Sequence, residues 1–200
     1  LGLYELVTAI RLKEFKPFNL PNKKIPSCLN GHESYSFNEV LDADTLLKVE
    51  SIAKSENITL FQMLISCYFK TIQGFSGHND LVIRLATDNR DRSFNNIQMV
   101  TGCIADSLPL RIQITKNDNI MSICDQVKSK LIEVGNYNTL SSIDYANIYN
   151  SRSEGGPMGI TPFGISYLNI DYFNKINEIE LPLIEARSAL PFTDLSLSLI

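Results

Sequence analysis

Residues 41–56 place apolar side chains at helical spacing. These side chains are Leu46, Leu47, Ile52 and Ala53. The spacing predicts an amphipathic helix with one apolar stripe. Asp42 or Asp44 can cap its first turn, because a carboxylate there accepts hydrogen bonds from backbone N–H groups that have no partner inside the helix. Residues 57–59 end the pattern.

A second helix is predicted from Thr59 to the turn at residues 74–80. Thr59 and Gln62 have the spacing of a capping box, in which each side chain satisfies the backbone N–H of the other residue. The apolar side chains that follow surround nearly the whole helix: Leu60, Phe61, Met63, Leu64, Ile65, Tyr68, Phe69 and Ile72. We therefore expect this helix to be mostly buried.

Strands and helices alternate over the rest of the chain. The predicted elements are strands at 33–40, 81–87, 106–115, 163–170, 178–184 and 194–200, a helix from a cap at Asp118 to Gly135, and a short helix at 141–149. Residues 17–35 are rich in proline and polar side chains and predict a connector. This alternation indicates a soluble α/β domain. Because the last residues stop inside a strand pattern, we expect the chain to be truncated at its C-terminus.

Composition narrows the class of protein. The 200 residues are 44% hydrophobic and 20% charged, as is ordinary for a soluble globular protein. A net charge of −4 and a pI of about 5.2 disfavour a nucleic-acid-binding surface. No run approaches the roughly 18 apolar residues of a membrane span, and the first residues lack the features of a signal peptide. The four cysteines have no Cys-x-x-Cys spacing, which favours reduced thiols in a cytoplasmic protein.

The usual catalytic residue types give little support for a site. His32 and His78 both lie in predicted turns, where a solvated histidine is expected. Cys103 would need a base beside it to act as a nucleophile, and a buried structural thiol is the simpler interpretation. Residues 88–91 imitate the start of a calcium loop but lack its later glycine and glutamate, so a solvated loop and no metal site are expected.

Asp106 is the unusual residue, because it is an acid inside the uncharged run 101–110. Burying a carboxylate without a partner costs several kcal/mol, so Asp106 needs water, a cation or hydrogen-bond donors. Arg111 lies on the opposite face of a regular strand, whereas Arg90 or Arg92 from the preceding loop could reach it. Asp106 is either a functional group or a solvated acid at the start of a strand.

From about residue 18 onward, successive segments resemble the C-terminal lobe of a nonribosomal peptide synthetase condensation domain. Residues 84–92, RLATDNRDR, are similar to the family's G-x-P-V-A-G-R-x-R, and residues 100–112, VTGCIADSLPLRI, to its I-G-x-F-V-N-T-x-x-L-R. The other similar segments are the two-helix stretch at 41–83, SSIDYANIYN at 141–150, MGITPFGISYLN at 158–169 and LPFTDLSLSLI at 190–200. Each segment is weak alone, but together they follow the family's order.

The resemblance implies an α/β fold of the α+β sandwich type: a chloramphenicol acetyltransferase-like lobe with a mixed sheet packed with helices. This lobe would be one half of a two-lobe condensation domain. Residues 1–35 would be the inter-lobe connector with the end of the preceding segment, and residues 36–200 would be the C-terminal lobe. In the family, a donor and an acceptor thioester enter a tunnel between the lobes, and the acceptor amine attacks the donor to give an amide.

The implied partners are the N-terminal lobe, peptidyl carrier proteins with their phosphopantetheine arms, and an adenylation domain. No directly bound cofactor, nucleic acid or membrane is expected. The family's HHxxxDG motif is absent from these 200 residues. We therefore expect no catalytic residue here and no condensation by this part alone. It would supply tunnel wall and carrier-protein surface, although the residues of the carrier or lobe interface are not assigned.

The resemblance assigns the tunnel or interface to Gly102, Asp106, Ser107, Arg90 and Arg111. Asp106 stands where the family motif has asparagine, and Ser107 stands where it has threonine. Arg90 is kept, although Asn89 replaces the glycine before it, and Ser142-Ile143 replaces the histidine and glutamine of H-Q-D-Y. A carboxylate in place of an amide would alter the tunnel lining. Our hypothesis is that Asp106 faces the tunnel mouth and pairs with an arginine or water.

Two alternatives remain open. The parent could be a degenerate condensation-like domain used for docking or recruitment. It could also be an epimerising or cyclising relative that shares this lobe. An intact HHxxxDG motif in the preceding lobe would favour catalysis, whereas a broken one would favour docking.

Overall fold

The computed structural model describes residues 12, 15, 16, 18, 37, 39–88, 90, 95–102, 105–135, 161, 163–167 and 195–199. The predicted short helix at 141–149 and the predicted strand at 178–184 lie outside the described residues. So does most of the predicted connector at 17–35.

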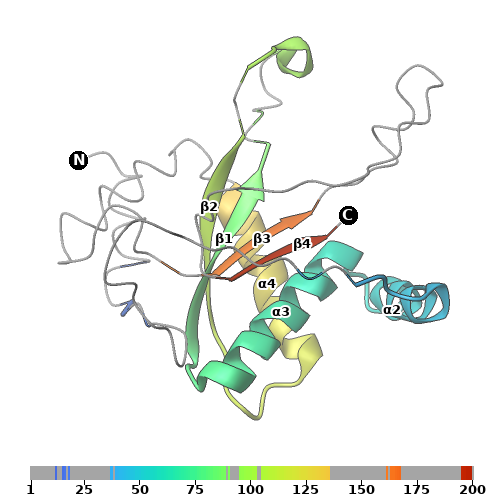
Figure 1. The fold of residues 1–200 in the computed structure, drawn as a ribbon, viewed down its shortest axis with the longest axis vertical. Coiled ribbons are helices and arrows are strands. Elements are labelled where there is room, and N and C mark those ends of the chain that lie inside the picture. Colours follow the sequence, from blue (N-terminus) through green and yellow to red (C-terminus); the bar gives the residue numbers. More distant parts are fainter. Residues whose placement is uncertain are drawn as a thin grey trace.

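The described chain forms a four-stranded mixed sheet with helices. The elements are α2 (Ala43–Ser55), α3 (Leu60–Ser76), β1 (Asp80–Thr87), the 3₁₀ helix η1 (Ile97–Met99), β2 (Asp106–Gln113), α4 (Ile120–Gly135), β3 (Phe163–Tyr167) and β4 (Leu195–Leu199). The strand order is β2-β1-β3-β4. β1 and β2 are antiparallel, whereas β3 is parallel to both β1 and β4. β1 and β2 extend beyond the other elements as a long hairpin that carries η1 at its tip (Figure 1). The predicted mixed sheet with helices is therefore confirmed.

One face of the sheet packs against α3 and α4. The buried strand side chains of this face are Leu81, Ile83 and Leu85 of β1, Leu108, Leu110 and Ile112 of β2, and Phe163 and Ile165 of β3. Ile65, Phe69 and Ile72 of α3 and Ile123 and Val127 of α4 join the same cluster. Phe61 of α3 stacks on Tyr167 of β3 with ring centroids 5.2 Å apart. The prediction that the second helix is mostly buried is confirmed.

The predicted starts of α2 and α3 are confirmed in atomic detail. Asp42 accepts hydrogen bonds from the Thr45 hydroxyl at 2.7 Å and from the Thr45 backbone N–H at 2.8 Å, and both bonds lower the pKa of Asp42. In α3, Thr59 Oγ1 accepts from the Gln62 N–H at 3.1 Å, and Gln62 Oε1 accepts from the Thr59 N–H at 2.8 Å. Gly77 ends α3 in the left-handed conformation with φ at 73°, which glycine adopts without steric cost.

The predicted cap of the third helix is wrong by one residue. Asn119 Oδ1, not Asp118, accepts from the Ser122 backbone N–H at 2.8 Å. Asp118 Oδ2 accepts from the Thr115 N–H at 2.6 Å and so closes the turn between β2 and α4. Adjacent Asp and Asn residues both suit a cap, and the turn geometry selects between them. The predicted end of the helix at Gly135 is confirmed.

Two predictions around α2 also need correction. Of the predicted apolar stripe, only Ala53 is buried, while Leu47 and Ile52 remain 62% and 50% exposed. Phe37, Glu39 and Val40 lie in no strand, contrary to the prediction for 33–40, whose other residues up to 38 are outside the described chain. Periodicity gives the orientation of an apolar stripe, but not whether a neighbouring element covers it.

We expect Thr59→Ala to lower the free energy of unfolding by about 1 kcal/mol, because it leaves the Gln62 N–H without its intrahelical cap. Thr71→Ala is the matched control, since Thr71 is exposed in the middle of α3 and its Oγ1 donates only to its own helix, to the Cys67 carbonyl. This control should change stability by less than about 0.5 kcal/mol. Urea denaturation measures both, and equal losses would contradict the capping role of Thr59.

Candidate functional site: the polar face of the sheet

The sheet face opposite α3 and α4 carries mostly small or polar side chains. By strand register, it presents Val82, Arg84 and Ala86 of β1, Ser107, Pro109 and Arg111 of β2, Gly164 and Ser166 of β3, and Ser198 of β4. We call these residues the polar face. Arg84, Ser107, Pro109, Arg111 and Ser166 are half-buried, and Ser198 is exposed. The Ser166 and Ser198 hydroxyls are hydrogen-bonded at 3.1 Å. Val82, beside Arg111, is buried and belongs to the same core cluster as Leu12 and Phe15, so the exposed polar part of this face lies around Arg84 and the serines.

Arg84 lies at the centre of the polar face. Its Nε and Nη2 both donate to Ser107 Oγ, at 3.3 and 2.9 Å. The backbone N–H of Ser107 in turn donates to Oδ1 of Asp106 at 2.7 Å. Of the two predicted residues at 106–107, Ser107 therefore lies beside an arginine that was not predicted, whereas register places Asp106 on the other face of β2.

Asp106 is the first residue of β2, where it pairs with Thr87, and its side chain is half-buried. The prediction that it starts a strand is confirmed. Register places Asp106 on the same face as Leu108 and opposite Arg111, and its Oδ1 accepts from the Ser107 N–H.

Arg111 is held by Asp80 on the neighbouring strand. Arg111 Nε donates to Asp80 Oδ1 at 2.8 Å, and Nη2 donates to Oδ2 at 2.6 Å, in a two-pronged ion pair. The guanidinium also lies over the Phe15 ring, 5.7 Å from its centroid. Register places Arg111 beside Val82 and on the opposite face from Asp106, as the strand alternation predicted. The geometry gives Arg111 a role in joining β1 to β2.

Arg90 and Gly102 lie in the connection that forms the hairpin tip. Arg90 Nη1 donates to the carbonyls of Ile97 and Val100, at 2.6 and 3.0 Å, and so closes the turn around η1. Gly102 is exposed, and outside this residue and its two chain neighbours no atom lies within 4 Å of where a Cβ would stand. Arg92, the other predicted partner of Asp106, lies outside the described residues.

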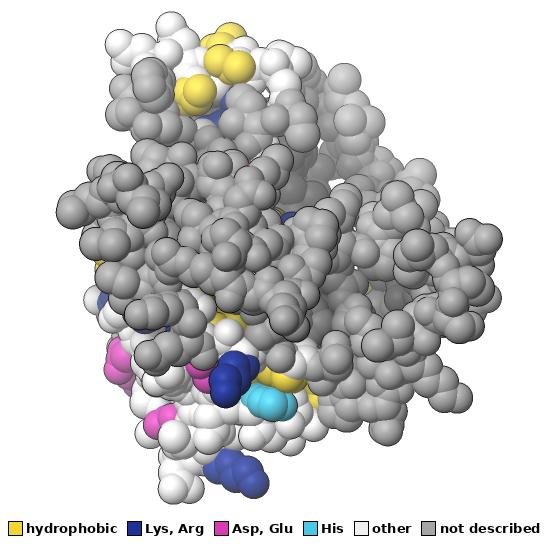
Figure 2. Space-filling view, turned by 90° about the vertical axis from the view of Figure 1, so that its left-hand side faces the viewer, with side chains coloured by type: hydrophobic (Ala, Val, Ile, Leu, Met, Phe, Trp, Pro, Cys, Tyr) yellow, Lys and Arg dark blue, Asp and Glu magenta, His cyan; other side chains and the backbone are white. Residues whose placement is uncertain are grey.

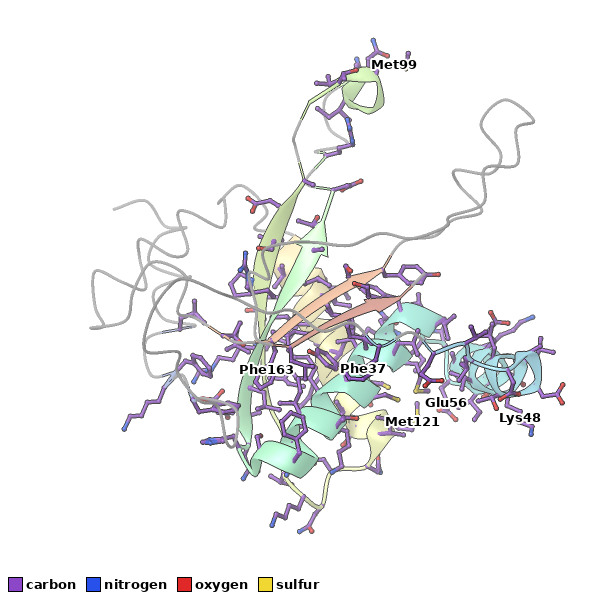
Figure 3. The ribbon with its side chains drawn as sticks, viewed as in Figure 1. Phe37, Lys48, Glu56, Met99, Met121 and Phe163 are labelled. Atoms are coloured by element: carbon purple, nitrogen blue, oxygen red, sulfur yellow. The ribbon has the colours of Figure 1, made fainter. Side chains whose placement is uncertain are left out.

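The hairpin tip exposes apolar side chains. Met99 is 81% exposed and Val100 is 47% exposed. Figure 2 looks at the left-hand side of Figure 1 and shows hydrophobic side chains at the upper end of the molecule. In Figure 3, Met99 lies at the tip of the hairpin, far from Phe163 in the sheet. Two exposed apolar side chains therefore stand next to each other at the end of the hairpin.

The remaining catalytic candidates do not gather into a site. His78 lies in the turn after α3, as predicted, and stacks on Phe18 with ring centroids 3.8 Å apart. Cys124 is fully buried, and this burial raises the pKa of its thiol, so it stays protonated at neutral pH. Among the residues that the structure describes, no three His, Cys, Asp or Glu side chains come together as metal ligands. His32 and Cys103 lie outside the described residues.

Sequence reasoning missed Arg84. One signal could have revealed it, because Arg84 is a charged residue within the otherwise uncharged strand 81–87. Its partner Ser107 is distant in sequence, so only the register of β1 and β2 brings the two together.

None of the described helices has the length and apolarity that a membrane span needs.

The comparisons with known proteins identify the fold and the family. The solved EpoB NRPS cyclization-docking bidomain from Sorangium cellulosum superimposes with a TM-score of 0.69 at 16% identity, over 82% of this chain and 34% of that chain. The first condensation domain of the calcium-dependent antibiotic synthetase gives a TM-score of 0.66 at 11% identity, over 83% of this chain and 34% of that chain. The predicted fold class is thus confirmed.

Curated relatives cover shorter stretches. Nonribosomal peptide synthetase nlsA of Emericella nidulans is 28% identical over 96 residues, which are 48% of this chain and 2% of that protein. Surfactin synthase subunit 1 of Bacillus subtilis is 18% identical over 93 residues, 46% of this chain and 2% of that protein. The chain therefore spans only a small part of these relatives. The family model described as Condensation domain matches residues 10–154. The chain belongs to the condensation domain family.

Proposed function

We propose that this chain is part of a nonribosomal peptide synthetase condensation domain, which joins a donor acyl or peptidyl thioester to an acceptor aminoacyl thioester. The observation that carries this proposal is the family match over residues 10–154. In the reaction, the acceptor amine nitrogen attacks the donor carbonyl carbon. A C–N bond forms, the C–S bond breaks, and the phosphopantetheine sulfur of the donor carrier leaves as a thiol once it takes up the proton that the amine loses.

The proposed role of this chain is to form one wall of the tunnel between two lobes. The coverage supports this role, since the chain accounts for 34% of the solved condensation domain chain that it overlaps. The polar face supplies hydroxyl and guanidinium groups for a wall that contacts polar thioester substrates. The exposed Met99 and Val100 at the hairpin tip suit contact with the N-terminal lobe. We also propose that the connector ends at residue 35 and that the C-terminal lobe begins at residue 36.

The proposed partners are the N-terminal lobe, peptidyl carrier proteins bearing phosphopantetheine, and an adjacent adenylation domain, in the cytoplasm. The amine attack requires the histidine motif, and these 200 residues contain no HHxxxDG. The N-terminal lobe would therefore supply the catalytic histidine. We expect this chain alone to be inactive, while the intact domain forms the amide.

The test compares the intact domain with this chain alone. Donor and acceptor carriers are loaded with acyl and aminoacyl phosphopantetheine, and the amide product on the acceptor is measured by mass spectrometry. The intact domain should give product, and the chain alone none. An intact domain that binds its carriers yet forms no amide would contradict the catalytic proposal and favour a docking or recruitment domain. Product from this chain alone would contradict the two-lobe proposal.

Asp106→Asn tests the proposed contribution of Asp106 to the tunnel mouth, because it restores the amide of the family motif without changing the size of the side chain. We expect the rate of amide formation by the intact domain to change at least about tenfold, since a charge beside the entering substrate alters its binding. Asp125→Asn is the control, because Asp125 is exposed on α4. Equal rates for wild type and Asp106→Asn would show that Asp106 is a solvated acid at a strand end.

A further inference from the structure

Arg84 occupies the middle of the polar face, between a proline and a glycine of the neighbouring strands. In the sheet register, β2 places Pro109 on one side of Arg84 and β3 places Gly164 on the other. Ala86, the next residue of β1 on the same face, is also small and is exposed. The side chain of Arg84 is therefore the largest one on this part of the sheet surface. In the segment similar to G-x-P-V-A-G-R-x-R, Arg84 stands at the place of the first glycine.

The Arg84 side chain is fixed in place. Two of its nitrogens, Nε and Nη2, donate to the same Ser107 oxygen, at 3.3 and 2.9 Å. Two donor atoms on one acceptor restrict both the position and the tilt of a planar guanidinium. Arg84 is also only half-buried, so part of its surface stays available to water or to a group lying against the sheet.

A fixed, half-buried guanidinium discriminates between the groups that can lie on it. A large apolar group lying on this half-exposed cation would remove charged surface from water, and this desolvation is unfavourable. The nearby Ser107, Ser166 and Ser198 hydroxyls extend the same polar surface. A short polar group covers less of the charged surface and is itself compatible with the guanidinium and hydroxyl groups beside it.

We propose that Arg84 is a specificity-determining residue, which restricts the substrate group lying against this wall to a short polar one and excludes large aliphatic or aromatic groups. This inference rests on the proposed function, because it takes the polar face to be a wall of the substrate tunnel. The proposed restriction comes from the size, charge and position of Arg84, whatever further contacts its guanidinium makes.

The test uses the intact condensation domain that contains this chain. Carriers are loaded with seryl or phenylalanyl phosphopantetheine, each offered in turn as donor and as acceptor, and kcat/KM is measured for every pair. Wild type should favour the seryl over the phenylalanyl group by at least about tenfold at one of the two positions, within the range by which a pocket discriminates a difference of one or more carbon atoms. Arg84→Gly should reduce this ratio about tenfold, and Arg84→Lys should preserve most of it.

The ratio separates specificity from simple loss of structure, because a merely destabilised domain loses activity toward both groups equally. Arg84→Ala is included because glycine in a strand can weaken folding. Unchanged ratios in Arg84→Gly and Arg84→Ala, with amide formation intact, would overturn the inference and leave the proposed function standing.

If wild type forms no amide with any pair, the proposed function fails separately. The inference is then judged by titrating the domain with non-hydrolysable seryl and phenylalanyl pantetheine amides. A preference for the seryl compound that disappears in Arg84→Ala supports the inference. Equal affinities in wild type and variant overturn it.

Discussion

Phe69→Ala is expected to lower the free energy of unfolding by about 3–5 kcal/mol. Phe69 has no exposed surface and lies in the cluster where α3 meets β1, β2 and α4. Truncation removes most of its side chain from a site enclosed on several sides, so the surrounding residues cannot collapse to fill the cavity. The loss therefore includes the transfer free energy of the ring and the cost of the cavity. Urea denaturation followed by circular dichroism measures this change.

Phe37→Ala is the control with the same chemical change. Phe37 is 91% exposed, so its truncation should change stability by less than about 0.5 kcal/mol. A loss in Phe69→Ala no larger than that in Phe37→Ala would mean that α3 does not pack on the sheet as described. A change in the m-value would instead indicate that the substitution alters the compactness of the denatured or native state.

Asp80→Ala is expected to cost about 1.5–3 kcal/mol, because it removes two hydrogen bonds from a charged partner at a half-buried site. The side chains of Arg111 and Asp80 are only 19% and 33% exposed, so water replaces the lost carboxylate incompletely. The pair also joins the first residue of β1 to β2, far from the tip of the hairpin. Denaturation of Asp80→Ala, Arg111→Ala and the double variant gives the coupling between the two side chains.

Lys130→Ala provides the comparison with an exposed ion pair. Lys130 and Glu133 lie 2.8 Å apart on α4, with side chains 44% and 34% exposed. Exposed pairs of this kind contribute about 0–1 kcal/mol, since solvent screens them and holding two side chains costs entropy. If Asp80→Ala and Lys130→Ala lower stability equally, the ion pair of β1 and β2 is no stronger than a surface one.

Structural features that depend on only a few consecutive residues were predictable from the sequence. The capping box of Thr59 and Gln62 needs only four consecutive residues, and it marked the start of α3 correctly. The cap of α4 was misplaced because Asp118 and Asn119 are both good caps, and the choice depends on the turn from β2. The exposure of Leu47 and Ile52 was not predictable, because it depends on what lies beside α2 and not on the helix itself.

The site was predictable only in part, for a related reason. Asp106 and Ser107 were found because they interrupt an uncharged run and match a family motif. Arg84 was missed, because its contact with Ser107 depends on the register between β1 and β2. The opposite faces of Asp106 and Arg111 were predicted correctly, because alternation along one strand needs no knowledge of its neighbours.

The order of strands in the sheet has a consequence during synthesis. Residues 60–135 supply α3, β1, β2 and α4 from one continuous stretch, but β3 joins β1 only later, and the hydrogen bond from Thr161 to the Val82 carbonyl spans 79 positions of the chain. Such a long closure is entropically costly and slow. Until residue 167 has left the ribosome, the β1 edge that later receives β3 has unpaired N–H and C=O groups. A nascent chain with such an open edge is a template for pairing with other strands, and we expect chaperone binding to matter most in that interval.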